Sequence, residues 1–354
     1  MTAQPTERGA PALPRAHGGA LGGARLRCAP EDFRVVEQLA FAFEGQGEHV
    51  YLKIRKREAN TEWVAQRLAA LAGAPRAAVG FAGKKDRHAV AEQWFSVHVP
   101  GRDEPDWSAL DNEEVQVLDS ARHARKLRTG ALRGNAFDIV LRELDAPRAA
   151  LDARLSRIAA EGVPNYFGEQ RFGIDGGNLE RAAAMFAGRL RERNRSKRGL
   201  YLSAARSWLF NLVLARRVED GTWNRALDGD VMMLDGSQAV FDAGPGDAAI
   251  DGRVQSMDIH PTGPMWGRGE LRTRGEARRI EEEVLESHAA WREGLERAGM
   301  KQERRALRLP VRDLGWTLAE PRSLRLRFFL GAGSYATGVL HEIVEYVDVG
   351  GDTR

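Results

Sequence analysis

The amino-acid sequence predicts an α+β fold in which a helix-rich insertion interrupts a strand-rich domain. Alternating apolar and polar residues, which are typical of half-buried strands, recur between Phe33 and Arg142. Amphipathic helical patterns take over at 177–218 and again at Glu276–Ala298. Strand character returns in the segment SLRLRFFL at 323–330, where leucines and phenylalanines alternate with arginines.

The first part of the chain contains most of the expected strands. Residues 1–24 are rich in Pro, Gly and Ala and are predicted to form a disordered tail. A helix is expected over Thr61–Leu71, with Thr61 as N-cap and Gly73 as the C-terminal stop. The strands that alternation indicates are Phe33–Glu37, Val50–Ile54, Gln93–Val99, 115–118 and 136–142.

A helix expected from about Pro147 to Ala160 ends at Gly162, and the character of the sequence changes there. We therefore place the first part of the strand-rich domain at 25–160, the insertion at 161–309 and the second part at 310–354. A further helix is expected at 338–346, after the last strand-like segment.

Composition excludes several classes of protein. The chain has 354 residues, enough for two domains. No apolar run approaches the ~18–20 residues that span a bilayer, and the N-terminus has no secretory pattern. One cysteine, Cys28, cannot form an internal disulfide, so we expect a cytoplasmic protein. The 46 Arg against 7 Lys fit either a G- and C-rich genome or phosphate binding.

Three familiar motifs fail on inspection. Gly83-Lys84 is followed by Lys85 rather than Ser or Thr, so it is not a Walker loop. The segment 341–345 has Glu345 where a zinc-protease helix needs its second histidine. No glycine fingerprint for a dinucleotide follows a predicted strand, and the histidines are scattered. The sequence therefore predicts neither a metal site nor a cofactor.

The segment GFAGKKDRHA at 80–89 places Asp86 among the cations Lys84, Lys85 and Arg87 and the potentially cationic His88. Flanking cations favour the ionised carboxylate, which can act as a nucleophile or a base. The same cations could hold a polyanion. A solvated turn with locally paired charges fits these residues as well, and local chemistry leaves these alternatives open.

Five segments of the sequence favour a functional over a purely structural role for the Asp86 segment. They are GFAGKKDRHAVAEQWFSV, RKLRTGALRGNAF, GVPNYFGEQRFG, YLSAARSWLFN and FFLGAGSYAT. In this order they closely resemble the TruD family of tRNA pseudouridine synthases, over nearly the whole chain from Gly22 to Val347. The resemblance implies a pseudouridine-synthase-like catalytic domain with a mixed, mainly antiparallel sheet, interrupted by an inserted α/β domain. It also implies isomerisation of the uridine at position 13, in the D-arm of tRNA, after that uridine flips out of its stack.

The resemblance assigns roles to individual residues. Asp86 matches the family's catalytic nucleophile, and Arg27 aligns with a lysine that pairs with it. Phe33, in the E-D-F block, matches a residue that lines the uridine pocket. Asn135 and Phe137 match pocket residues of the G-N-x-F block. Phe137 also stands where many other pseudouridine synthases have a tyrosine.

The last of these residues is Tyr335, which replaces the phenylalanine of the family's G-S-F-A-T block and keeps a ring for stacking. Without the resemblance, Phe33 and Phe137 would be read as core residues, Asn135 as a turn residue and Tyr335 as a packing residue ahead of a helix.

tRNA is the expected partner, and nothing in the sequence implies a protein partner, so we expect a monomer. Four basic clusters fit a broad RNA surface: Arg122–Arg133, Arg189–Arg198, Arg268–Arg279 and Lys53–Arg57. Any one of them could be a solvated face. The individual RNA-binding candidates are Lys84, Lys85, Arg87, His88, Arg125, Lys126, Arg128 and Arg171.

Two rival functions remain. An RNA-binding or RNA-folding protein would use the same basic surface without catalysis, but it has no use for a carboxylate that faces phosphates. A hydrolase would use Asp86 to activate water, and the absence of a metal set or a second carboxylate in that block argues against it.

Overall fold

The computed structural model describes residues 13–101, 104–243, 248–319 and 322–350. The chain divides into two compact units. Unit 1 consists of Met1–Gly19, Ser156–Pro310 and Thr337–Glu342, and unit 2 of Ala20–Leu155, Val311–Ala336 and Ile343–Arg354. The insertion predicted at 161–309 lies inside the Ser156–Pro310 segment. Among the described residues, no helix is both long enough and apolar enough to cross a bilayer.

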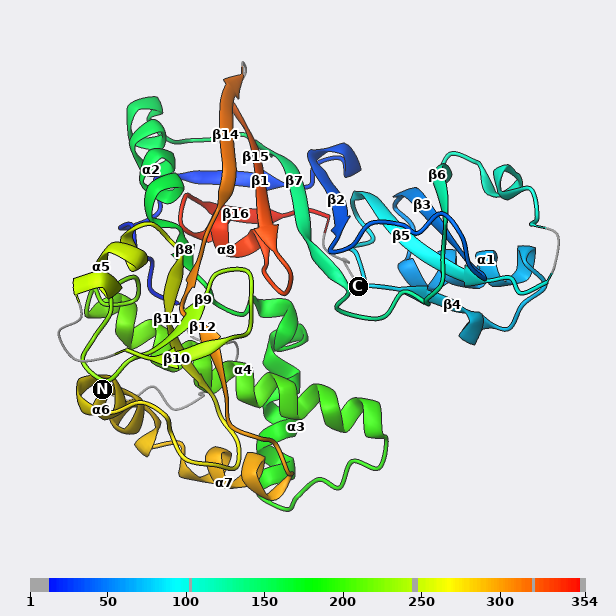
Figure 1. Cartoon of the computed structure of the whole chain (residues 1–354). Coiled ribbons are helices and arrows are strands. Elements are labelled where there is room, and N and C mark those ends of the chain that lie inside the picture. The colour runs from blue at the N-terminus through cyan, green and yellow to red at the C-terminus, as the bar shows by residue number, and fades with distance from the viewer. Residues whose placement is uncertain (1–12, 102–103, 244–247, 320–321, 351–354) are drawn as a thin grey trace. The chain divides into compact units, whose positions relative to one another are not determined.

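Unit 2 is built on a 10-stranded mixed sheet whose main path runs β14-β15-β7-β2-β5-β3-β6 (Figure 1). β1 pairs with β16 and β7, and β4 pairs with β5. The pairs β1–β16 and β2–β5 are parallel, and the other described pairs are antiparallel. The predicted mixed, mainly antiparallel sheet is therefore confirmed. Its strands are β1 Gly23–Leu26, β2 Phe33–Leu39, β3 His49–Arg57, β4 Val79–Phe81, β5 Val90–His98, β6 Val115–His123, β7 Leu132–Arg142, β14 Arg312–Ala319, β15 Ser323–Gly331 and β16 Glu345–Asp348.

Alternation along the strands gives the sheet two chemically different faces. In β15 the side chains of Leu324, Leu326 and Phe328 are buried, whereas those of Arg325 and Arg327 are exposed. Successive side chains of a strand point to opposite faces of the sheet, and residues that are register partners in neighbouring strands point to the same face. We call the side that carries Phe328 the site face and the side that carries Arg327 the outer face.

Helix α1, Thr61–Leu71, has the predicted bounds and ends where predicted, since Gly73 adopts a positive φ of 58°. The N-cap is Asn60 rather than Thr61, because the Asn60 side chain accepts a hydrogen bond from the Glu62 amide. The Thr61 hydroxyl instead donates to Gln93 inside the sheet unit. The apolar face of α1 packs with β3, β4 and β5 in one buried cluster that includes Val64 and Leu68.

Unit 1 holds α3 Gly177–Phe186, α4 Arg195–Glu219, α5 Ala248–Gln255, α6 Gly275–Glu286 and α7 Ala289–Arg297. It also holds a 4-stranded sheet, β10-β9-β11-β12, and a 2-stranded sheet, β13-β8. The helical pattern expected at Glu276–Ala298 is present as two helices, since the chain turns at Ser287 and His288. This turn lets Leu285 and Leu295 enter the same core. The strands are β8 Val163–Pro164, β9 Val231–Leu234, β10 Val240–Asp242, β11 Ile259–Met265, β12 Glu303–Ala306 and β13 Arg308–Leu309.

The helix expected at Pro147–Ala160 is α2, Arg148–Glu161, and Gly162 follows it with a φ of 76°. The helix expected at 338–346 is wrong in its second half, because α8 covers Ala336–His341 and β16 begins at Glu345. The β16 segment is extended because it pairs with β1 in parallel.

The tail predicted at 1–24 is wrong for residues 13–24, and residues 1–12 lie outside the described residues. The amides of Ala16 and His17 donate to the carboxylate of Glu342, which is fully buried. The His17 ring is also buried and hydrogen-bonds the Gly162 carbonyl. The prediction from composition failed because the carboxylate that binds this segment, Glu342, lies more than 300 residues away along the chain.

Candidate active site

The loop between β4 and β5 carries Asp86, and a buried lysine holds its backbone. Lys56 of β3 is fully buried, and its Nζ donates to the carbonyls of Asp86 at 2.6 Å and Ala59 at 2.8 Å. Burial lowers the pKa of Lys56 to about 8, although the nearby Asp86 carboxylate acts in the opposite direction. These contacts fix the backbone of the loop while the Asp86 side chain stays 35% exposed.

A buried ion pair fixes the other side of the same loop. Lys85 Nζ lies 2.6 Å from Glu37 Oε2, with 8% and 0% of the two side chains exposed. The second oxygen of Glu37 accepts the Trp94 amide at 3.2 Å. The Lys85 amide donates to the Thr61 hydroxyl at the start of α1. Lys85 was expected to bind RNA, but its ammonium group faces a buried carboxylate, so we remove it from the RNA-binding candidates.

Arg27 is brought to Asp86 by the end of β1. The residue follows Leu26 with a φ of 58°, a left-handed conformation that turns the chain out of the strand. Arg27 Nη2 lies 3.6 Å from Asp86 Oδ2, and only 6% of the arginine side chain is exposed. Its guanidinium carbon stands 4.6 Å from the centre of the Phe33 ring. The structure therefore places Arg27 beside Asp86, the neighbour that the family resemblance implies for it.

Three buried aromatic rings continue from Arg27 across the site face. Phe33 and Phe137 meet edge to face with ring centres 6.1 Å apart. Phe137 in turn stacks on Phe328, with ring centres 5.3 Å apart. The rings come together because Phe137 pairs with Val35 in one neighbouring strand and with Phe328 in the other.

Asn135 lies inside β7, not in the turn that local chemistry suggests, and shares the site face with Phe137. Its Oδ1 is buried and has no hydrogen-bond partner among the described residues. A buried amide oxygen without a donor carries an energetic cost, which a bound ligand with an N–H group would relieve. Tyr335 is half-buried and follows β15 at the end where Leu330 pairs with Asn135.

The other cationic candidates differ in exposure. Lys84 and Arg87 are exposed on the Asp86 loop, and His88 is half-buried there. Arg125 and Arg128 are exposed on the segment between β6 and β7. Two further candidates have protein partners, since Lys126 donates to the Ala77 carbonyl and Arg171 to the Ser203 hydroxyl.

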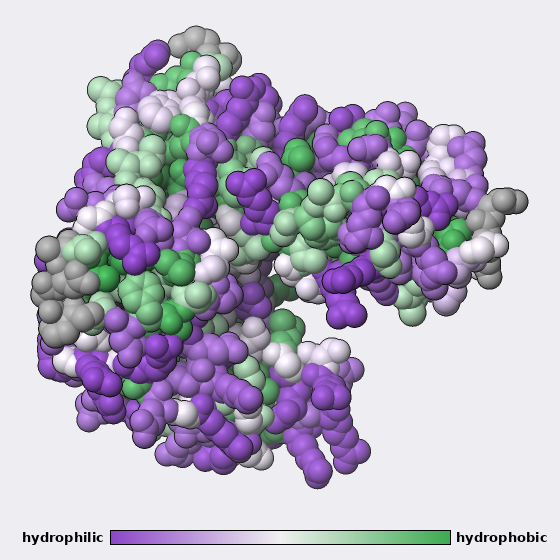
Figure 2. Space-filling model, viewed as in Figure 1, coloured by the Kyte–Doolittle hydropathy of each residue, from purple (hydrophilic) through white to green (hydrophobic). Residues whose placement is uncertain are grey.

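The four basic clusters also differ in how far their charges are neutralised. In Arg268–Arg279, Arg272, Arg278 and Arg279 each pair with a carboxylate. In Arg189–Arg198, by contrast, no cation has an ion-pair partner within the part of the chain that the structure describes, and all are exposed. Figure 2 shows mainly hydrophilic residues over this α3–α4 region of unit 1.

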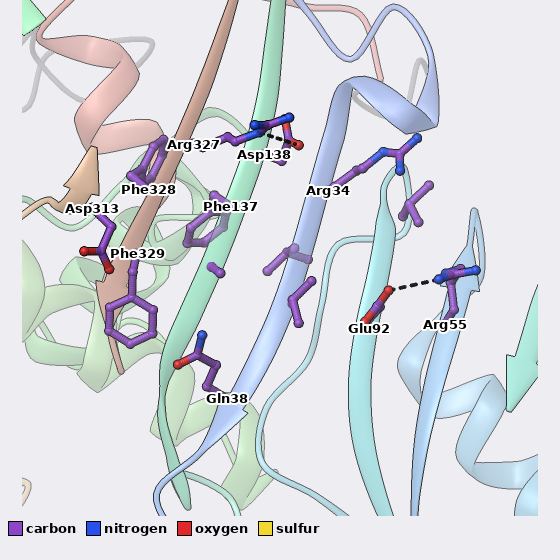
Figure 3. Close-up of a pocket in the computed structure, with 14 residues that line it drawn as sticks. Arg34, Gln38, Arg55, Glu92, Phe137, Asp138, Asp313, Arg327, Phe328 and Phe329 are labelled. Atoms are coloured by element: carbon purple, nitrogen blue, oxygen red, sulfur yellow. Dashed lines mark hydrogen bonds and ion pairs between the residues drawn. The ribbon is translucent and has the colours of Figure 1, made fainter. Parts of the chain in front are cut away.

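A groove of about 420 Å³ crosses the outer face of the sheet in unit 2 (Figure 3). Arg55 of the Lys53–Arg57 cluster lines it beside Glu92, and Arg327 lines it beside Asp138. Burial would raise the pKa of both carboxyls, but hydrogen bonds from neighbouring cations outweigh burial and lower it. Two ion pairs thus line the groove, and Asp86 is not among its lining residues.

Sequence reasoning missed three residues of the site. Glu37 had a signal, because a carboxylate in FRVVEQL falls on the same alternating face as Phe33. Lys56 also had a signal, because it lies between Arg55 and Arg57 in β3 and its side chain therefore points to the opposite, buried face of the strand. Asp348 had no signal in the local sequence. Its Oδ2 lies 3.6 Å from Arg27 Nη2, and this contact depends on the pairing of β1 with β16.

A carboxylate–guanidinium pair beside buried rings and an amide oxygen without a donor can hold a planar, hydrogen-bonding ligand next to a nucleophile. Among the described residues, no group of three or more His, Cys, Asp or Glu side chains could hold a metal ion. Such an arrangement suits an enzyme that acts on a nucleobase.

Comparison with known proteins gives the family. The family model described as tRNA pseudouridine synthase D (TruD) matches residues 18–185 and 177–343. The chain is 52% identical to tRNA pseudouridine synthase D of Methylococcus capsulatus over 346 residues, 98% of each chain. It is 51% identical to that of Nitrosococcus oceani over 333 residues, 93% of each chain.

A solved structure supports the fold. The crystal structure of the putative tRNA pseudouridine synthase D from Methanosarcina mazei superimposes with a TM-score of 0.71 at 22% identity, covering 92% of this chain and 94% of that one. The chain belongs to the tRNA pseudouridine synthase D (TruD) family. It is a tRNA pseudouridine synthase, as the resemblance of its five blocks implies.

Proposed function

We propose that this enzyme converts the uridine at position 13, in the D-arm of tRNA, to pseudouridine, with Asp86 as the nucleophile. The observation that carries the proposal is the contact of Asp86 with the buried Arg27 guanidinium, which itself lies over Phe33. A buried guanidinium next to a partly exposed carboxylate orients that carboxylate and leaves its oxygens open to a substrate.

The reaction breaks the N1–C1′ bond of uridine, turns the uracil and joins it again through C5. Base and sugar keep all their atoms, so the net change consumes no redox cofactor or nucleotide. The chemistry needs a carboxylate next to C1′ or C6 and a site that retains the detached ring. Asp86 supplies the carboxylate, and the site face of the sheet supplies the surroundings of the ring.

The uracil is held by Phe33, Phe137, Asn135 and Tyr335. The two phenylalanines offer apolar contact, and the buried Asn135 Oδ1 can accept the N3–H of uracil. Tyr335 stands at the same end of the strands as Asn135 and adds a ring for stacking. The target base must leave its stack to reach these side chains, which is base flipping.

The catalytic domain is then formed by 25–160 and 310–354, most of which lies in unit 2, and 161–309 is the family-specific insertion. We propose that the exposed cations Lys84, Arg87, Arg125 and Arg128 bind tRNA phosphates, with His88, Lys126 and Arg171 as weaker contributors because they are less exposed. The enzyme acts as a monomer in the cytoplasm.

The RNA surface is tested by the salt dependence of tRNA binding. Each phosphate contact that is lost reduces the log–log salt slope by about 0.7–0.9. The double variant Arg191→Gln/Arg193→Gln removes two exposed cations without ion-pair partners in the described chain. Arg279→Gln is the matched control, because its charge is already paired with Glu283. Equal slopes for the three proteins would exclude the Arg189–Arg198 cluster from the RNA surface.

Catalysis is tested by mapping pseudouridine on unmodified tRNA transcripts for the wild type, Asp86→Asn and the surface control Asp119→Asn. We expect the wild type and the control to convert a single D-arm uridine, and Asp86→Asn to bind tRNA and convert none. Equal tRNA binding with no pseudouridine from any protein would favour an RNA-binding function. Release of free uracil would instead favour a hydrolase.

A further inference from the structure

We propose that Asp348 is a positioning residue that holds the Arg27 guanidinium in the site and keeps its charge compensated while Asp86 reacts. The inference rests on the proposed function, in which Asp86 is the nucleophile. Arg27 Nη2 lies 3.6 Å from one carboxylate oxygen of Asp86 and 3.6 Å from one of Asp348. The guanidinium therefore bridges two carboxylates from distant parts of the chain.

The position of Asp348 is set by backbone pairing. β16 runs parallel to β1, and Asp348 is the register partner of Leu26, the residue before Arg27. The amide of Val349 donates to the Leu26 carbonyl at 3.0 Å, which extends this pairing past the strand. Asp348 Oδ1 accepts the Gly350 amide at 3.2 Å, so Oδ2 remains directed toward Arg27.

Arg27 has little other compensation for its charge. Its side chain is 6% exposed, and its Nε is buried without a hydrogen-bond partner in the described parts of the chain. A buried charge that loses its counter-charge is strongly destabilised, so Arg27 needs a carboxylate at every stage of the reaction.

Asp86 cannot provide that charge throughout. If its oxygen bonds to C1′, the N1–C1′ electron pair leaves with uracil and the negative charge passes to the base. If it adds to C6, the charge passes to the uracil ring. If it takes a proton from the sugar, the carboxylate becomes a neutral acid and the electrons of the broken C–H bond expel the base. In each case Asp86 becomes neutral, and Asp348 is the carboxylate that remains beside Arg27.

Close packing keeps Arg27 between the two carboxylates. A Cβ at Gly350 would stand 2.8 Å from Arg27 Cβ and 3.1 Å from its Cδ, closer than side-chain atoms approach. Gly350→Ala therefore crowds Arg27, and also His88 Cβ at 3.3 Å, without changing any charge, and it gives a second way to perturb the same arrangement.

The test measures steady-state pseudouridine formation on a tRNA transcript with the full-length protein. Asp348→Asn keeps the shape of the side chain and the acceptor for Gly350, and it removes only the charge. Because the charge is needed after tRNA has bound, we expect kcat to fall about tenfold or more while KM changes less than about twofold. Asp348→Glu should recover part of kcat, and Glu345→Gln, in the same strand, should match the wild type.

A double-variant cycle separates action through Arg27 from a general effect on the fold. In an Arg27→Gln background, Asp348→Asn should cause no further loss of kcat. Additive losses, a kcat equal to that of the wild type, or an effect confined to KM would each overturn the proposal. If Asp348→Asn folds poorly by thermal denaturation, Gly350→Ala decides, since it should lower kcat at constant KM. A wild type that forms no pseudouridine would refute the proposed function itself, whereas an active wild type with an equally active Asp348→Asn refutes only this inference.

Discussion

The Glu37–Lys85 pair predicts a large cost for removing either charge. The two side chains are almost completely buried and their charged atoms are 2.6 Å apart. Lys85→Met would leave the Glu37 carboxylate buried with its Trp94 contact but without a cation. Breaking a buried pair from one side costs about 3–5 kcal/mol, because the remaining charge is uncompensated. Glu37→Gln should cost a similar amount, since it leaves the Lys85 ammonium group unpaired.

Removing both charges should cost less than the sum of the two single changes. In Lys85→Met/Glu37→Gln no uncompensated charge remains, and the glutamine oxygen can still accept the Trp94 amide. The matched control is Arg25→Met, which removes one partner of an exposed ion pair with Glu143. Exposed pairs contribute about 0–1 kcal/mol, so the control should leave stability nearly unchanged.

The assay is urea denaturation combined with hydrogen exchange of the β5 amides, because a chain with two units need not unfold in one step. The Trp94 amide reports directly on the pair, since Glu37 is its acceptor. A loss of 3–5 kcal/mol corresponds to a fall in protection of about two to three and a half powers of ten. Single variants that lose less than about 1 kcal/mol, or a double variant that shows a strictly additive loss, would refute the reasoning.

Three further predictions concern other buried groups. The pKa of Lys56 falls from 10.5 to about 8 on folding, so between these values the unfolded chain holds a proton that the folded chain has lost. The free energy of unfolding of the wild type, relative to that of Lys56→Met, should therefore rise with pH in that window by at most about 1.4 kcal/mol per pH unit. Urea titrations at several pH values measure this difference. A difference that does not change with pH would contradict the prediction. Gly134→Ala would place a Cβ 2.2 Å from a backbone oxygen of β15 and should cost about 1–3 kcal/mol in thermal denaturation, whereas Gly315→Ala has open space and should cost far less. Arg217→Met breaks the buried ion pair with Asp230 and should lower the free energy of unfolding by about 3–5 kcal/mol. Arg216→Met breaks an exposed ion pair with Asp220 on the same helix and should lower it by only about 0.3–0.5 kcal/mol. Equal urea midpoints for the two variants would refute this ranking.

The sequence predicted elements well where local pattern decides them. The helix expected at about Thr61–Leu71 was found there, although its N-cap is Asn60, because an amphipathic face and a terminal glycine are both local signals. The alternation of 323–330 likewise gave β15 its buried and exposed sides. Where distant pairing decides, local pattern failed: Glu345 was placed in a helix, but it lies in β16 because β1 supplies a partner strand.

The same division holds for the candidate site. Asp86 contacts Arg27 and Phe33 contacts Phe137, so four residues that the family resemblance names lie in contact as two pairs. Their roles stay predictions. The cations of the Asp86 loop were treated as one group, although Lys85 is buried and Lys84 is exposed. Neighbours in a loop can point in opposite directions, so burial cannot be inferred from adjacency in the sequence.

The two-stranded sheet of β8 and β13 brings the two ends of the insertion together. Val163 and Leu309 are register partners in an antiparallel pair, so the chain leaves and returns about 5 Å apart. Gly162 permits this close approach, because a Cβ there would meet the Leu309 carbonyl at 2.6 Å. Segments whose ends lie together can be lengthened, shortened or exchanged without moving the framework that carries them. Evolution could thus remodel the residues between 163 and 309 to suit different RNAs while the strand register around Asp86 stays the same.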